Sequence, residues 1–303
     1  ERNGERFVAQ ARARNADTGE QKSSFLRSGP MLTKPFQQLE NWISYFRRAD
    51  IPVFRRTIDA IERLRENEDD VSPSDFVSIV QGDPLMTLKV LVFAAERRSS
   101  RVVTDSETVT SSLVLMGVSP FFRKFTGMTC VEDLLKDDPM ALHGLEEVVT
   151  RAFRAAHFAL GFAVHRMDHD AEVIREAAFL HDFVEMLLWC HAPLLAHEIR
   201  HRLLADPAAR SSVVQRAVLN VDPLDLQHGL MEAWRLPELL AQITDHRQFG
   251  HPRVRNVVLS VNLARHTQRG WDNPALPDDY RAIGELLNVS AEHAHRKALE
   301  LDA

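Results

Sequence analysis

Glycine is scarce in this sequence, with 12 in 303 residues, and few segments alternate apolar and polar residues. Alternation with a period of two is the signal of half-buried strands, so its rarity argues against a β-rich fold. Apolar residues instead recur three and four positions apart, as in Leu85, Leu88, Leu91 and Val92. This pattern predicts an all-α protein with many helices of roughly ten to twenty residues.

Cysteines and long apolar runs are also few. Cys130 and Cys190 form neither a metal-binding spacing nor a disulfide-rich pattern, which favours a reducing, cytoplasmic environment. No apolar stretch approaches the roughly 20 residues that a membrane helix needs, so we expect no membrane association. No secretory signal is recognisable, and a first residue of Glu1 indicates an incomplete or processed chain.

The chain has no excess of positive charge. Lys and Arg together number 37 against 43 Asp and Glu, which gives a formal net charge of −6. This balance opposes broad, non-specific binding to nucleic acid, so nucleic acid is not an expected partner. The basic run Arg97–Arg101 and the Arg-rich start keep a nucleic-acid-binding regulator open as an alternative.

Composition divides the chain into three parts. Residues 1–34 are polar and have little capacity to form a core, which predicts a mobile or loosely docked tail. A charged stretch that ends at Pro139 separates two groups of helical patterns. We therefore expect an N-terminal helical lobe at residues 35–135 and a second helical lobe, with the C-terminal helices, at residues 136–303.

The most informative motif is the pair His181-Asp182, which lies inside the apolar run Ala177–Trp189. Two polar side chains with metal-ligand chemistry are costly to bury without partners. A metal, a hydrogen-bond network or descent from a metal site would each account for them. His157 upstream and His246 downstream could complete a site for a divalent transition metal.

A second motif is His197-Glu198-Ile199-Arg200-His201, which matches the H-E-x-x-H pattern of zinc proteases. A zinc site also needs a third protein ligand. Leu204 and Pro207 stand where one continuation of the motif requires Gly and His, and no Glu occurs between Glu198 and Glu232. The segment is better explained as a solvated helix face, so a zinc protease is disfavoured.

Further segments carry a family resemblance: Ile51–Phe54, Phe76–Leu91, Val109–Gly117, Phe179–Asp182 and His228–Pro237. In this order and spacing they resemble the HDOD domain, a bacterial signalling relative of the HD metal-dependent phosphohydrolases. The resemblance covers about residues 40–270. It implies an HD-like helical bundle lobe that packs against a smaller N-terminal helical lobe.

The sequence departs from the enzymatic relatives around the doublet. In those enzymes an upstream His, the His-Asp pair and a distant Asp hold cations that activate water. Phe183-Val184-Glu185 replaces the Gly and Lys that usually follow the pair, and Arg265 falls at the position of the distant Asp. Arg cannot ligate a metal, and its charge opposes cation binding. We therefore expect no catalytic residue, metal or cofactor, and a doublet held by hydrogen bonds.

The resemblance implies a non-catalytic bacterial signal-transduction or regulatory module. Its expected partner is a signalling protein, with a nucleotide as a candidate small ligand in the groove near His157, His181, Asp182 and His246. The alternative is a degenerate HD-type phosphohydrolase or nucleotide phosphodiesterase, which would hold a divalent transition metal at these four residues.

Overall fold

The computed structural model describes residues 31–97, 107–206 and 209–302. The regular elements in these ranges are all helices, and the only extended pairing among them is a parallel bridge between Val53 and Cys130. The all-α prediction is therefore confirmed. Residues 1–30 of the predicted tail and the basic positions Arg98–Arg101 lie outside the described residues.

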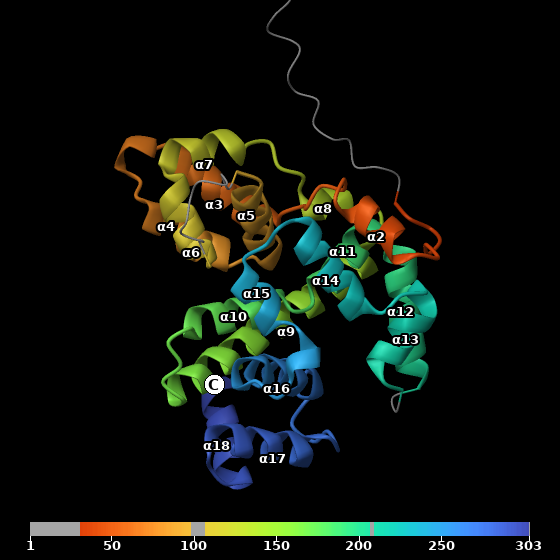
Figure 1. The fold of residues 1–303 in the computed structure, drawn as a ribbon. Coiled ribbons are helices and arrows are strands. Elements are labelled where there is room, and N and C mark those ends of the chain that lie inside the picture. Colours follow the sequence, from red (N-terminus) through yellow and green to blue (C-terminus); the bar gives the residue numbers. More distant parts are fainter. Residues whose placement is uncertain (1–30, 98–106, 207–208, 303) are drawn as a thin grey trace, which may run out of the picture. The chain divides into compact units, whose positions relative to one another are not determined.

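The first group of helices is shown in red to yellow-green in Figure 1. Its members are α2 (Leu39–Phe46), α3 (Arg55–Arg65), the 3-10 helix η1 (Glu68–Asp70), α4 (Pro73–Gln81), α5 (Pro84–Arg97), α6 (Val109–Met116), α7 (Val118–Lys124) and α8 (Val131–Leu134). Helices α3 to α7 pack on one another around buried aromatic side chains. Phe76 of α4 stacks on Phe121 of α7 with ring centroids 4.4 Å apart.

The second group begins with the longest helix. Its members are α9 (Pro139–His165), α10 (Ala171–Leu180), α11 (Phe183–His191), α12 (Pro193–Ala205), α13 (Ser211–Leu219), α14 (Pro223–Ala233), α15 (Glu238–Ile243), the 3-10 helix η2 (His246–Gln248), α16 (Pro252–His266), α17 (Leu276–Leu287) and α18 (Ala291–Asp302). Helix α9 contacts α10, α11, α12, α16 and α18, so it is the central element of this group.

Helix α9 has 27 residues, which exceeds the expected length, and small residues allow close packing along it. A Cβ atom at Gly144 would clash with the Trp189 ring, and one at Gly161 would clash with Leu301. These two glycines lower the intrinsic stability of the helix, but they let α11 and α18 approach the α9 backbone.

Asp83 directly precedes Pro84, the first residue of α5. The Asp83 carboxylate is fully buried and accepts hydrogen bonds from the backbone N–H groups of Leu85 (2.9 Å) and Met86 (3.1 Å). Its second oxygen accepts from the Phe54 N–H (3.1 Å) and the Thr57 hydroxyl (2.9 Å). The Asp83 carboxylate therefore caps α5 and also forms hydrogen bonds with the start of α3.

Helix α5 contacts both α10 and α11, the two helices that flank the His-Asp doublet. A second link runs from α10 to α6, because the Val109 N–H donates to the buried Glu176 carboxylate at 2.9 Å. The smaller helical group thus packs directly on the helices that carry the doublet. In the described part of the chain, no helix is both long and apolar enough to span a membrane.

Candidate functional site

The His-Asp doublet lies at a break between two helices rather than within one. Helix α10 ends at Leu180, and α11 begins at Phe183. Asp182 stands at the N-cap position of α11, but its side chain does not accept a capping hydrogen bond from that helix. The carboxylate is therefore free to turn toward α9 and α16.

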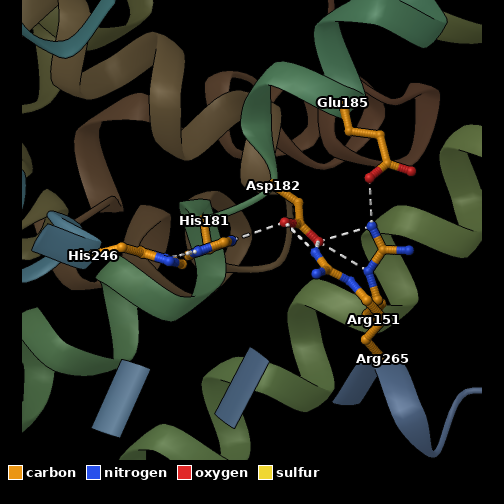
Figure 2. A network of polar contacts seen from close by, with 6 residues as sticks. All are labelled: Arg151, His181, Asp182, Glu185, His246 and Arg265. Atoms are coloured by element: carbon orange, nitrogen blue, oxygen red, sulfur yellow. Dashed lines mark hydrogen bonds and ion pairs between the residues drawn. The ribbon is translucent and has the colours of Figure 1, made fainter. Parts of the chain in front are cut away.

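The doublet is the middle of a chain of polar contacts, shown in Figure 2. We call this set the His-Asp cluster, and its members are Arg151, His181, Asp182, Glu185, His246 and Arg265. His181 Nδ1 lies 2.8 Å from Asp182 Oδ1, and His181 Nε2 lies 2.7 Å from His246 Nε2. The carboxylate can only accept, so His181 Nδ1 donates to it, and one of the two facing Nε2 atoms donates to the other.

Two guanidinium groups meet on the Asp182 carboxylate. Arg151, from α9, places Nε 2.9 Å and Nη2 2.8 Å from Oδ2. Arg265, from α16, places Nη2 3.2 Å from Oδ1 and 3.4 Å from Oδ2. Arg151 Nη2 also donates to Glu185 Oε2 at 2.8 Å. The side chains of Arg151 and Asp182 are only 8% and 10% exposed, so this ion pair is largely shielded from water.

The electrostatics of the cluster keep Asp182 ionised. Burial works to raise the pKa of Asp182, but the charges of Arg151 and Arg265 and the hydrogen bond from His181 outweigh it and hold the pKa well below its usual range. Burial, followed by the nearby His181 and Arg265, lowers the pKa of His246 to about 4. His246 is therefore a neutral imidazole at pH 7.

His246 is positioned by a short capped element. It is the first residue of η2, and Asp245 caps this 3-10 helix by accepting from the Arg247 N–H at 3.1 Å. Thr244, just before it, is buried and donates to carbonyl oxygens of α15. This segment follows Trp234, whose ring packs 5.8 Å from that of Phe183 in α11. Trp234 thus anchors the segment to α11, the helix that begins directly after the doublet.

The cluster does not fit a metal ion. Both oxygens of Asp182 accept from guanidinium groups, and both ring nitrogens of His181 face another side chain at hydrogen-bond distance. A cation here would have to displace two positive charges that already neutralise the carboxylate. Across the described residues, no group of three or more His, Cys, Asp or Glu side chains is arranged to bind a metal.

The structure brings together His181, Asp182 and His246, but it separates His157 from them. His157 is exposed on α9 and lines a different cavity, beside Leu301 and Asp302. The grouping of His157 with the doublet was therefore wrong. His157 follows Arg151 by six residues on α9. At about 100° per residue, its side chain is therefore turned about 120° away from the face that carries Arg151.

Arg151 is the member of the cluster that the sequence reading missed. It lies on the apolar stripe of α9, next to Val148, Ala152 and Ala155, and is buried with them. A charged residue in phase with a buried stripe requires a charged partner. This helical phase, rather than metal-ligand chemistry, is the sequence signal that points to Arg151.

The H-E-x-x-H motif lies on α12, where its residues have separate partners. His197 Nε2 lies 2.9 Å from Asp138, the residue that caps α9, and its ring packs on Trp189. Glu198 accepts from Arg202 at 2.7 Å. These contacts fit the interpretation of this segment as a helix face rather than a zinc site.

A cavity of about 260 Å³ adjoins the cluster. Its walls come from α11, α13, α14, η2 and α16, and they include the doublet, His246 and Arg265. A larger cavity of about 450 Å³ lies between α9, α11 and α12 and touches the cluster through Arg151 and Glu185.

The fold and the cluster together define a class of protein: an HD-like helical protein in which two arginines bind the Asp of the His-Asp pair. The family model of the HDOD domain matches residues 51–249 of the chain. The chain therefore belongs to the HDOD family, as its motifs predicted.

Solved structures agree on the fold. The MmoQ response regulator from Methylococcus capsulatus str. Bath is 18% identical with a TM-score of 0.59, over 82% of this chain and 98% of that one. A virulence factor from Campylobacter jejuni subsp. jejuni is 16% identical with a TM-score of 0.58, over 87% of this chain and all of that one. No curated protein matches the sequence significantly. The HD-like arrangement of two packed helical lobes is thereby confirmed.

Proposed function

We propose that this protein is a non-catalytic regulatory module of bacterial signalling that acts in the cytoplasm by binding a protein partner. One observation carries the proposal: both oxygens of the Asp182 carboxylate are bound by guanidinium groups, from Arg151 and Arg265. In an HD-type hydrolase this carboxylate would bind the cation that activates water. Here the arginines supply the positive charge, but they offer no open coordination position for water.

Family membership supports a regulatory role, because the chain carries an HDOD domain over residues 51–249. One protein of the same fold is described as a response regulator. At 18% identity this likeness shows the fold alone, so the regulatory role of the present chain is part of the proposal.

A hydrolysis assay tests the absence of catalysis. Purified protein is incubated with Mn²⁺ or Fe²⁺ and with bis(p-nitrophenyl) phosphate, and the rate is compared with that of His181→Ala. We expect the two rates to be equal. His157→Ala is the matched control, because it removes an exposed His that lies outside the cluster.

Metal-dependent hydrolysis that His181→Ala abolishes and His157→Ala preserves would overturn the proposal. It would favour the alternative, a degenerate phosphohydrolase in which the arginines move away from Asp182 when a cation binds.

A further inference from the structure

The cavity beside the His-Asp cluster contains an unsatisfied amide. Gln227 of α14 lines this cavity, is only 4% exposed, and its Nε2 atom has no hydrogen-bond partner. An unpaired amide in a buried position is destabilising compared with an apolar side chain of the same shape. A ligand that offers an acceptor to Gln227 would remove this cost.

The charged groups that line the cavity are already paired. Asp182 binds Arg151 and Arg265, Glu185 binds Arg151, and Asp222 pairs with Arg216. His246 Nε2 lies 2.7 Å from His181 Nε2, so this imidazole also has its partner within the cluster. The described lining therefore leaves no unpaired positive charge for a phosphate or a carboxylate.

The remaining polar groups are suited to an uncharged ligand. Besides Gln227, the lining includes the amides of Gln215 and Asn262 and the hydroxyl of Ser212. Val258 and the other apolar side chains of the lining complete the walls of the cavity. Side-chain amides donate and accept at adjacent atoms, which is how Asn and Gln bind the edges of nucleobases.

We propose that this cavity binds a small, flat, uncharged heterocycle with the hydrogen-bonding edge of a nucleobase, and that the Gln227 amide binds that edge. The volume of about 260 Å³ is below the usual range for drug-sized ligands, so a single base or nucleoside fits better than a dinucleotide. The proposal deepens and rests on the regulatory function, because a ligand bound without being hydrolysed would serve as a signal.

Calorimetric titration of the full chain tests the proposal. The probes are adenosine, guanosine, cytidine and uridine, then their 5′-monophosphates, and finally inorganic phosphate. We expect at least one nucleoside to bind, its monophosphate to bind no more tightly, and phosphate alone not to bind.

Gln227→Met keeps the length and the unbranched shape of the side chain but removes its amide. We expect it to weaken nucleoside binding at least tenfold while the melting temperature of the ligand-free protein stays equal or rises. Gln242→Met is the matched control, because Gln242 is exposed on α15 and its side-chain amide donates to Glu238 on the same helix. If Gln227→Met does not fold, Asn262→Leu provides the second variant, with the same expected loss of binding.

Three results would overturn the proposal: no nucleoside binds the wild type at millimolar concentration, Gln227→Met binds as well as the wild type, or a monophosphate binds at least tenfold more tightly than its nucleoside. These results do not bear on the proposed absence of catalysis. Conversely, hydrolysis of a monophosphate probe would count against that function without bearing on nucleoside binding.

Discussion

Two buried aspartates stand immediately before helices, and the protein satisfies them in opposite ways. Asp83 precedes α5 and accepts hydrogen bonds from three backbone N–H groups and one hydroxyl. Asp182 precedes α11 and is bound by two guanidinium groups and one imidazole. The first carboxylate has only neutral donors, whereas the second is part of an ion-pair network.

The different partners give the two carboxylates opposite responses to burial. Burial raises the pKa of Asp83, and its neutral donors offset this only in part. At Asp182 the two arginines outweigh burial, and the pKa falls well below its usual range. The buried carboxylate with neutral donors, Asp83, serves as a helix cap. At Asp182, the two arginines supply positive charge next to the carboxylate, as a bound metal ion would.

The largest expected effect comes from removing the shared cation. Arg151→Met leaves Asp182 and Glu185 without the cation that they share, and breaking a buried ion pair costs about 3–5 kcal/mol. Urea unfolding measures the loss. Arg154→Met is the matched control on the same helix, where Arg154 pairs with the more exposed Asp302 and a loss of about 1 kcal/mol or less is expected. Equal losses in the two variants would contradict the ion-pair account.

A third buried carboxylate, that of Glu176, sharpens the comparison. Within the described residues it forms no ion pair, and only one of its two oxygens accepts a hydrogen bond. Glu176 accepts one backbone hydrogen bond, its Oε1 has no partner, and burial raises its pKa to about 7 from 4.5. The folded protein therefore loses stability as the pH rises from about 4.5 through 7. Glu176→Gln should remove this loss and stabilise the protein by up to roughly 3 kcal/mol at pH 8, but not at pH 4. Urea midpoints at the two pH values test this, and an equal effect at both would contradict it.

The pH dependence of Asp182 has the opposite sign. Since its pKa is lower in the folded state, it stabilises the protein above its unfolded pKa, and this contribution is lost as the pH falls through the folded value. Asp182→Asn should be less stable at pH 7, yet it should lose up to about 1.2 kcal/mol less than the wild type between pH 7 and pH 3, the limit that the ordinary pKa of Asp in the unfolded chain sets. Thermal unfolding across this range measures the slopes. Equal dependence of stability on pH in the wild type and in Asp182→Asn would show that the arginines do not lower the pKa of Asp182.

The smallest expected effect is at Asp83. Thr57→Val keeps the shape of the side chain but removes one of four hydrogen bonds to the carboxylate, which should cost about 1 kcal/mol in urea unfolding. The three backbone donors remain, so the protein should stay folded. A loss as large as that of Arg151→Met would mean that the two aspartates are not supported differently.

The same contrast explains what could be predicted from the sequence. The Asp83-Pro84 cap is local: its donors Leu85 and Met86 follow within three residues, so the motif alone indicates a helix start. The Asp182 network is not local, because Arg151 lies on another helix and only the packing of α9 against α11 brings the two together.

The two predictions about distant residues of the site had different outcomes for a physical reason. Arg265 was located because family spacing aligned it with a ligand position, and it does contact Asp182. His157 has the chemistry of a metal ligand, but its helical phase places it on another face of α9. Residue type suggests the chemistry of a site, but helix phase decides which side chains reach it.

The central claim is that Arg151 and Arg265 bind the Asp182 carboxylate in place of a metal ion. Metal analysis of the wild-type protein tests it most directly, after incubation with Mn²⁺, Fe²⁺ or Zn²⁺ and removal of free ions. The account predicts no stoichiometric metal, and no difference between the wild type and His181→Ala. Stoichiometric metal in the wild type that is lost in His181→Ala would contradict it.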